Sequence, residues 1–215
     1  MSKTVGVIGG MGPEATVDFL RRIVAATPAR HDQDHIRVLV DNNPKVPSRL
    51  AHIVEGTGAD PAPVLIEMAR GLAAQGADFL AIPCNTAHHY LPQIADAVSI
   101  PVLDMVALAS AKAGSGRIGM LASPALKTVG LYRGAVFPDA EGDARILGVI
   151  NAVKAGNVAA QHRRDYAAVA ASLDVDAYLI ACTELSVLGP PGGIAKPVVD
   201  ALDVLVAETV ARAIR

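Results

Sequence analysis

Tryptophan is absent from this sequence of 215 residues, and aromatic residues make up only 3% of it, although 52% of the residues are hydrophobic. The core must therefore consist mostly of alanine, valine, leucine and isoleucine. Such residues suit helices that pack on buried parallel strands. The chain is long enough to bury a large core, either in one domain or in two small ones.

The sequence also lacks a strong charge excess and a long apolar run. The formal net charge is −2 and no basic cluster is present, so nothing favours nucleic-acid binding. The apolar runs are too short to cross a membrane. Residues 1–4 lead directly into an expected strand, which leaves no room for a signal peptide. We therefore expect a cytoplasmic protein.

Cysteine is scarce, and the two cysteines present lie in similar surroundings. Cys84 follows the apolar run 79–82 and Cys182 follows the apolar run 178–181, with an aspartate six residues before each. In a reducing compartment they are more often free thiols than a disulfide. A buried cysteine often serves as a small hydrophobic residue, but the repeated setting, with hydroxyl or amide side chains after each thiol, favours a chemical role. Two cysteines without paired histidine spacing do not make a zinc site.

Strand-like and helix-like segments alternate along the chain, which predicts an α/β fold with parallel sheets. The segment from residue 117 repeats the pattern that begins at residue 5, so we predict two pseudo-symmetric domains of flavodoxin-like or Rossmann-like type. We expect strands at 5–8, 36–40, 79–82, 117–122, 145–149, 178–181 and 197–199, and helices at 13–24, 61–74, 87–98, 105–113, 127–136, 158–173 and 201–214. Ligands of open parallel sheets bind beyond the carboxyl ends of the strands. Both cysteines lie at such ends, so we expect them on opposite walls of one cleft.

Two loops at strand ends could contribute to this cleft. A glycine turn at residues 9–12 leaves amide N–H groups available for an anion. It lacks the G-x-G-x-x-G spacing of a dinucleotide site, which argues against nucleotide binding. The stiff loop 41–49 could direct Asn43 or Arg49 into the cleft, whereas a solvated surface arginine is the alternative.

Two facing thiols meet the requirement of a racemase, which removes a proton from one face of a stereocentre and returns one to the other. A thiol whose pKa falls from about 8.5 towards neutrality can act both as base and as acid. A helix that starts just after each cysteine favours the thiolate. Amide groups of the turns, together with Asn85, Thr86 and Thr183, could hold the α-carboxylate in the transition state.

Four motifs resemble the aspartate/glutamate racemase superfamily, most closely its aspartate racemase branch. They are GVIGGMGPEAT (6–16), NPKVPSR (43–49), PCNTAH (83–88) and ACTEL (181–185). The resemblance implies a racemase without a cofactor that acts on a small-molecule amino acid, with its active site between two domains. The first domain comprises residues 1–103 and 200–215, and the second comprises residues 104–199. The last helix is expected to pack on the first domain. A homodimer is also implied.

The resemblance gives roles to individual residues. It makes Cys84 and Cys182 the acid/base pair, and it assigns the distal carboxylate of the substrate to Arg49 and Lys154. The other residues expected to contact the substrate are Gly10, Met11, Gly12, Asn43, Asn85, Thr86, Ser123, Thr183 and Glu184.

One position departs from the family pattern. Leu126 stands where a threonine is common, which predicts a more apolar pocket and leaves open whether the substrate is aspartate, glutamate or another amino acid. A hydantoin racemase and a maleate isomerase, in which one thiolate attacks a double bond, are alternatives. A non-catalytic small-molecule sensor on the same fold is a third.

Overall fold

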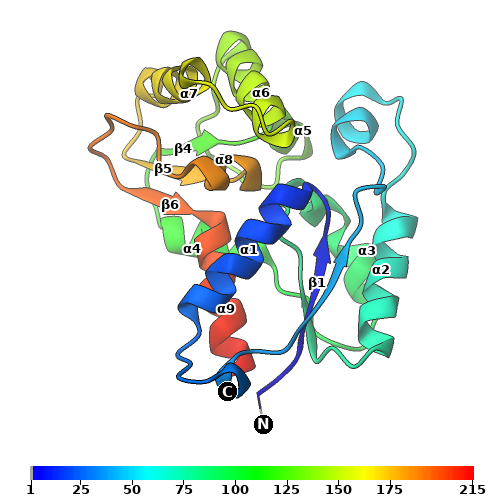
Figure 1. The fold of residues 1–215 in the computed structure, drawn as a ribbon. Helices are drawn as coiled ribbons and strands as arrows, with labels where there is room; N and C mark the ends of the chain where they lie inside the picture. Colours follow the sequence, from blue (N-terminus) through cyan, green and yellow to red (C-terminus); the bar gives the residue numbers. More distant parts are fainter. Residues whose placement is uncertain (1) are drawn as a thin grey trace.

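The computed structural model describes residues 2–215 and contains two parallel sheets of three strands, one in each half of the chain (Figure 1). The strand order is β2-β1-β3 in the first sheet and β4-β5-β6 in the second. The predicted α/β fold with two parallel sheets is confirmed. Within the described residues, no helix has the length and apolar character needed to span a membrane.

The strands are β1 (Val5–Gly9), β2 (Val38–Asn42), β3 (Phe79–Ala81), β4 (Ile118–Leu121), β5 (Ala177–Ile180) and β6 (Val198–Asp200). The α-helices are α1 (Pro13–Ala26), α2 (Ala62–Ala74), α3 (Leu91–Asp96), α4 (Met105–Ala113), α5 (Pro124–Val129), α6 (Ala140–Lys154), α7 (Ala160–Ser172), α8 (Thr183–Leu188) and α9 (Ala201–Ala213). Short helical turns of other types are η1 (Asp32–Asp34), η2 (Ala51–Glu55) and η3 (Thr86–Tyr90).

Isolated bridges at the sheet edges reveal the internal repeat. Val102 pairs with Leu80 beside β3, and Val136 pairs with Gly119 beside β4. The two halves therefore have the same order across the sheet. In the first half it is β2, β1, β3 and the segment at Val102, which leads into α4. In the second half it is the segment at Val136, β4, β5 and β6, which leads into α9. This repetition places β3 and β5, the strands before Cys84 and Cys182, at equivalent positions.

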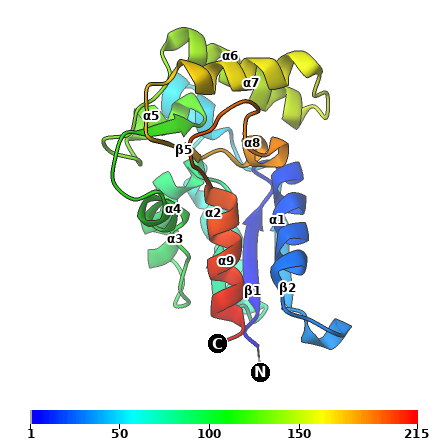
Figure 2. The same cartoon turned by 90° about the vertical axis from the view of Figure 1, so that its left-hand side faces the viewer.

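The closing helices α4 and α9 join the two halves. Each begins at a capping aspartate, Asp104 for α4 and Asp200 for α9. Helix α4 contacts β5 and β6, and α9 packs against α1 and α4. The last helix thus returns to the first half, as expected, and its end meets the start of the chain through a 2.8 Å hydrogen bond from Lys3 N to Ala213 O (Figures 1 and 2). The domain boundaries inferred from the resemblance stay a prediction.

One apolar core runs through the junction of the halves. It combines Val7 and Phe19 from the first half with Met120 and Leu179 from the second, and Leu205 of α9 packs among them. Two further clusters lie between each sheet and its outer helices, under α2 and α3 in the first half and under α6 and α7 in the second. The shared core fixes the two sheets relative to each other, so the walls of a cleft between them are also fixed.

Residues 145–149, predicted as a strand, lie inside helix α6. The side chain of Asp139 caps this helix by accepting a 2.8 Å hydrogen bond from Gly142 N. The buried apolar side chains recur at helical spacing, at Ile146, Val149, Ile150 and Val153. That spacing favours a helix over a strand, so the strand prediction was wrong because it considered too short a window.

Two other predicted helices have different limits. Helix α5 begins at Pro124, where Ser123 caps it, and ends before Gly130, which has a left-handed φ of 64°. It therefore does not extend over residues 127–136. The helix predicted at 87–98 is divided into the 3-10 turn η3 and the short helix α3. Strand β2 lies two residues further along the chain than predicted.

Candidate active site

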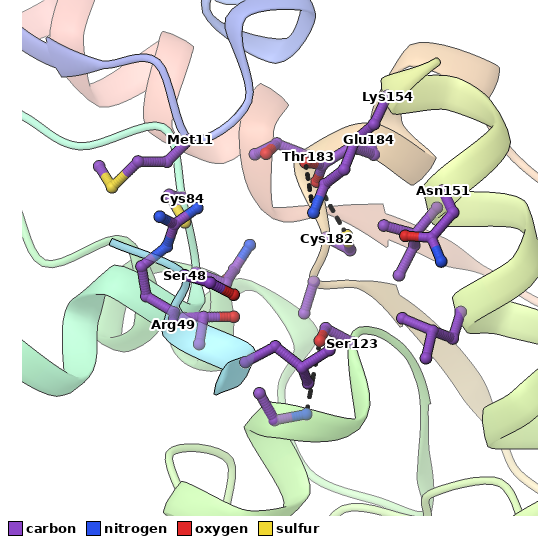
Figure 3. A pocket seen from close by; sticks show the side chains of 17 residues that line it. Met11, Ser48, Arg49, Cys84, Ser123, Asn151, Lys154, Cys182, Thr183 and Glu184 are labelled. Atoms are coloured by element: carbon purple, nitrogen blue, oxygen red, sulfur yellow. Dashed lines mark hydrogen bonds and ion pairs between the residues drawn. The ribbon is translucent and has the colours of Figure 1, made fainter. Parts of the chain in front are cut away.

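Both cysteines line one cavity of about 180 Å³ between the two halves (Figure 3). Cys84 follows β3, and Cys182 follows β5 and immediately precedes helix α8. Figure 3 shows Cys84 and Arg49 on one side of the cavity, and Cys182, Glu184 and Lys154 on the other. The cavity therefore lies at the carboxyl ends of both sheets, as expected for open parallel sheets.

Most residues predicted to contact the substrate line this cavity. These are Met11, Arg49, Asn85, Thr86, Ser123, Lys154, Thr183 and Glu184, together with the two cysteines. Gly10 and Gly12 instead line a wider outer space of about 550 Å³. That space shares Met11, Arg49, Lys154 and Glu184 with the inner cavity, so the two adjoin, and we call the outer space the entrance.

Asn43 lines neither the cavity nor its entrance. Its Oδ1 accepts a 2.9 Å hydrogen bond from Lys45 N, which closes a turn. Its backbone packs on Gly10, where a Cβ would lie 2.3 Å from the Asn43 carbonyl carbon and where φ is 91°. Only glycine fits at that position. The structure corrects the prediction for Asn43: it shapes the glycine turn and does not reach into the cavity.

His88 holds the backbone of Cys84 in place. Its Nε2 accepts a 3.0 Å hydrogen bond from Met105 N, so the proton of the neutral ring is on Nδ1, which donates to Cys84 O at 2.9 Å. Burial lowers the pKa of His88, which keeps the ring neutral. This histidine therefore ties the cysteine loop to the start of helix α4.

Cys182 has a carboxylate partner. Its Sγ donates to Glu184 Oε2 at 3.1 Å, and the other oxygen of that carboxylate lies 3.8 Å from Lys154 Nζ. Glu184 is 5% exposed. Its carboxylate therefore acts on Cys182 in surroundings that screen charge weakly.

The pKa of both thiols is raised, and the predicted lowering was wrong for the free protein. Burial is the main cause for each cysteine. At Cys84 the charge of Arg49 opposes it, whereas at Cys182 the charge and hydrogen bond of Glu184 add to it and put the pKa well above its usual value. Backbone N–H groups do favour each thiolate, but loss of hydration outweighs these short helical segments.

Positive charge exceeds negative charge around the cavity. Arg49 Nη1 donates to Pro47 O at 2.7 Å and to Val46 O at 3.2 Å, so backbone carbonyls hold its guanidinium at the cavity. Lys154 and Glu184 are close to neutral as a pair. Asn85 adds a donor, because its buried Nδ2 has no hydrogen-bond partner in the part of the chain that the structure describes. The arrangement suits a ligand with carboxylate groups.

Comparison with known proteins decides the family. Residues 8–209 match the family model described as Asp/Glu/Hydantoin racemase. The chain belongs to this family. An aspartate racemase from Picrophilus torridus is 30% identical, with a TM-score of 0.88 over 98% of this chain and 94% of that one. A glutamate racemase from Thermus thermophilus, 19% identical with a TM-score of 0.69 over 99% of this chain and 80% of that one, shares the fold.

A curated relative is the broad specificity amino-acid racemase RacX of Bacillus subtilis. It is 31% identical over 106 residues, which are 47% of this chain and 45% of RacX. This chain therefore matches less than half the length of that protein. The predicted resemblance to the racemase superfamily is confirmed.

One wall of the cavity was not predicted from the sequence. Leu147, Ile150 and Asn151 line it beside Lys154, and all four lie on one face of α6. Their spacing of three, four and seven residues is the signal that would have found them. They were missed because residues 145–149 were interpreted as a strand. Ser48, Leu50, Ala125 and Ala181 complete the lining.

Leu126 is not among the residues that line the cavity. Its side chain is fully buried in the core that also contains Met120 and Tyr132. Because Ser123 and Pro124 start a helix, the neighbouring Ala125 faces the cavity instead. The prediction that Leu126 makes the pocket more apolar was therefore wrong.

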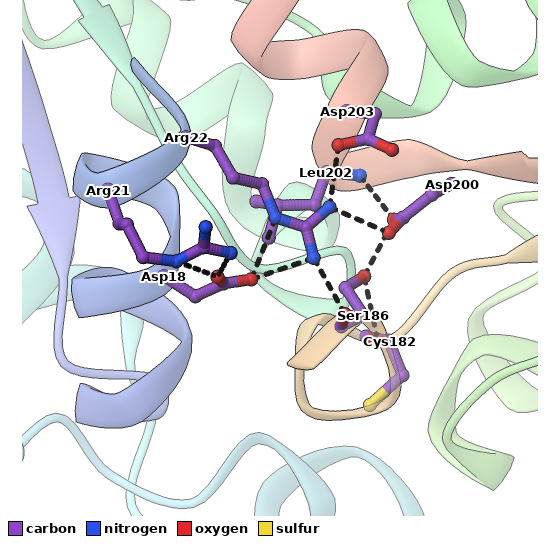
Figure 4. A network of polar contacts seen from close by, with 8 residues as sticks. All are labelled: Asp18, Arg21, Arg22, Cys182, Ser186, Asp200, Leu202 and Asp203. Atoms are coloured by element: carbon purple, nitrogen blue, oxygen red, sulfur yellow. Dashed lines mark hydrogen bonds and ion pairs between the residues drawn. The ribbon is translucent and has the colours of Figure 1, made fainter. Parts of the chain in front are cut away.

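A network of charges supports the wall that carries Cys182 (Figure 4). Arg22 of α1 donates to Asp18 Oδ2 at 2.8 Å, to Asp200 Oδ2 at 3.0 Å and to the carbonyl oxygen of Ser186 at 2.6 Å. The Ser186 hydroxyl donates to Asp200 Oδ1 at 2.6 Å. Helix α8, which begins after Cys182, is thereby tied to α1 and to the start of α9.

No group of three or more His, Cys, Asp and Glu side chains is placed to hold a metal ion within residues 2–215. The chemistry that the described site offers is that of two thiols, a carboxylate and two cations.

Proposed function

We propose that this racemase interconverts the L- and D-forms of an acidic amino acid, with aspartate as the first candidate, by a cofactor-independent two-base mechanism. The observation that carries the proposal is that Cys84 and Cys182 come from equivalent strands of the two halves and line one small cavity. A single cavity with a thiol from each half meets the need for an acid and a base on opposite faces of a carbon atom.

In the proposed reaction one cysteine starts as a thiolate and the other as a thiol. The thiolate removes the α-proton and becomes a thiol, and the electron pair stays on the α-carbon and its carboxylate. The second thiol then gives its proton to the opposite face and is left as a thiolate. Each turnover therefore exchanges the protonation states of Cys84 and Cys182, and no proton is gained or lost.

The raised pKa of both thiols requires the bound substrate to help form the thiolate. The α-ammonium group brings a positive charge into the cavity, and opposite charge nearby favours the ionised thiol. Arg49 already acts in this direction on Cys84, whereas Glu184 opposes ionisation of Cys182. We therefore propose that Cys84 is the thiolate in the predominant reactive form and that Cys182 is the thiol.

The charges of the site support an acidic substrate. Arg49, Lys154 and the free Nδ2 of Asn85 offer donors to two carboxylates, while Glu184 lies beside Cys182 and suits the α-ammonium group. Apart from the thiols, Arg49, Lys154 and Glu184 together carry one net positive charge, which is opposite in sign to the single net negative charge of aspartate or glutamate. A neutral amino acid would leave one cation without a partner.

Proton exchange in D₂O tests the proposal. L- and D-aspartate are incubated separately with the protein, with and without added pyridoxal phosphate, and α-deuterium and enantiomer ratio are followed by NMR and chiral chromatography. We expect deuterium to enter the α-position and the enantiomers to interconvert equally well without the cofactor. A wider panel, with glutamate, neutral amino acids, a hydantoin and maleate, separates the related activities. The proposal is refuted if no amino acid of the panel exchanges its α-proton.

We further propose, from the family resemblance, that the enzyme is a cytoplasmic homodimer. Analytical ultracentrifugation at micromolar concentration tests the association, and a monomer at all concentrations would contradict it.

A further inference from the structure

A hydrogen bond between the two halves ends at the residue that follows Cys84. Tyr132 belongs to the segment after helix α5 in the second half, and Asn85 lies in the first half. The Tyr132 hydroxyl donates to Asn85 Oδ1 at 2.6 Å. Both side chains are buried, with 6% of Tyr132 and 2% of Asn85 exposed. Both groups are therefore largely removed from bulk solvent.

The surroundings of Tyr132 decide which end of the amide it binds. Its ring packs in the core with Met120 and Leu126, and the one hydrogen bond of its hydroxyl within the described chain is to Asn85. If the amide were turned over, its NH₂ group would face the hydroxyl, and the tyrosine proton would be buried without an acceptor. An unsatisfied buried donor is costly. Tyr132 therefore binds the oxygen, and Nδ2 is the end of the amide left without a partner among the described residues.

Nδ2 of Asn85 is buried and has no partner among the described residues, although Asn85 lines the cavity. A donor held in this way is prepared for an acceptor that arrives with the ligand. With the amide reversed, Oδ1 would instead face the ligand and repel a carboxylate. The orientation of this one amide therefore sets the sign of the partial charge beside Cys84.

We propose that Tyr132 is a positioning residue for carboxylate binding: it orients the amide of Asn85 so that Nδ2 faces a carboxylate of the ligand. The inference rests on the proposed function for the identity of the ligand. Tyr132 of the second half thereby orients Asn85 of the first half. The amide is therefore held in its binding orientation only when the two halves are packed together.

Tyr132→Phe tests the inference, with Tyr178→Phe as the matched control. The Tyr178 hydroxyl is also buried and donates one short hydrogen bond, of 2.7 Å, to Ala170 O, and Tyr178 does not line the cavity. Binding of succinate, a dicarboxylate without an α-amino group, is measured by isothermal titration calorimetry. We expect Tyr132→Phe to weaken succinate about tenfold, since one oriented hydrogen bond to a charged group is lost. We expect Tyr178→Phe to bind succinate as the wild type does.

The kinetic constants and a double-mutant cycle separate positioning from general damage. Tyr132→Phe should raise KM for the racemised amino acid more than it lowers kcat. In the Asn85→Ala background, Tyr132→Phe should have no further effect, because the group that it orients is gone. The inference is overturned if Tyr132→Phe weakens succinate equally in both backgrounds, or if Tyr178→Phe weakens it as much.

A measurement on the wild-type protein covers the case in which Tyr132→Phe does not fold. The side-chain NH₂ signals of Asn85, assigned by their loss in Asn85→Ala, should shift when succinate is added, and unchanged signals would overturn the inference. Succinate binding needs no turnover, so a protein that binds succinate but exchanges no α-proton refutes only the proposed function. A wild-type protein that binds neither succinate nor aspartate refutes both.

Discussion

Cys182 Sγ donates a 3.1 Å hydrogen bond to Glu184 Oε2, whereas a threonine, Thr86, stands two residues after Cys84. The two thiols therefore occupy equivalent strand ends but different electrostatic surroundings. The pseudo-symmetry of the fold supplies two facing thiols, and Glu184 makes them unequal.

Glu184→Gln should lower the pKa of Cys182. Burial and the charge of Glu184 both raise this pKa, and glutamine keeps the size of the side chain while removing the charge. In the Cys84→Ser background Cys182 is the only thiol, so ultraviolet absorbance of the thiolate against pH reports it alone. We expect the titration midpoint to move to lower pH in Glu184→Gln. Glu14→Gln, at the exposed rim of the entrance, is the control and should leave it unchanged. A midpoint that stays or rises in Glu184→Gln would contradict the role of Glu184.

Cys84→Ser and Cys182→Ser should each abolish racemisation. A serine hydroxyl is a far weaker acid than a thiol, so at neutral pH it does not take over the proton transfer of the cysteine that it replaces. One remaining thiol can exchange the α-proton of one enantiomer only. Deuterium incorporation from L- and D-aspartate, measured separately for each variant, checks this result. Full racemisation by either variant would refute the two-base mechanism.

Arg49→Ala should raise KM for aspartate roughly ten- to a hundredfold, because a charge-assisted hydrogen bond contributes about 1.5–3 kcal/mol. Lys45→Ala is the matched control: it removes a positive charge from the same loop at an exposed position that does not line the cavity. Steady-state kinetics of all three proteins give the comparison. An Arg49→Ala enzyme with the KM of the wild type would place this arginine outside the binding site.

Arg22→Met should lower the free energy of unfolding by about 3–5 kcal/mol, because it leaves the buried carboxylate of Asp200 without its cation and removes one of the two arginines that bind Asp18. The neighbouring Arg21 also binds Asp18, at 2.6 Å, but its side chain is 69% exposed. Arg21→Met should therefore cost only about 0–1 kcal/mol. Urea denaturation curves of both variants measure the difference. Equal losses of unfolding free energy in the two variants would show that the burial of Arg22 does not determine its contribution to stability.

Leu126→Thr should destabilise the protein by about 2–5 kcal/mol, since it removes apolar volume from a fully buried site and adds a hydroxyl there. It should leave the ratio of kcat/KM between acidic and neutral amino acids unchanged, because Leu126 does not line the cavity. Ile150→Thr, which changes the cavity wall itself, is expected to alter that ratio. A changed preference in Leu126→Thr with unchanged stability would reverse this conclusion.

Local sequence was sufficient for the parts of the molecule that depend on local rules. Alternating apolar and helical segments predicted the α/β fold, and the repeated setting of Cys84 and Cys182 predicted that two thiols would meet in one cleft. The motif at 43–49 identified Arg49, which does line the cavity. The fold and the meeting of the two thiols follow from strand periodicity, turn residues and the rule that parallel strands end on one side of a sheet. The role of Arg49 came from the family resemblance, because local sequence left a solvated surface arginine as the alternative.

Tertiary structure decided what depends on neighbours distant in the chain. The thiol pKa could not be derived from the helical segment that follows each cysteine, because burial of the thiol among residues distant in the sequence outweighs that effect. Asn43 and Leu126 were assigned to the pocket by their place in motifs, yet one closes a turn and the other fills the core. The partner of Asn85 lies 47 residues away in Tyr132, and Glu184 acts on Cys182 only because both are buried together. Sequence thus determined which reactive groups this protein carries, and the packing of the two halves decided their charge and orientation, since both depend on which groups exclude water from the cavity.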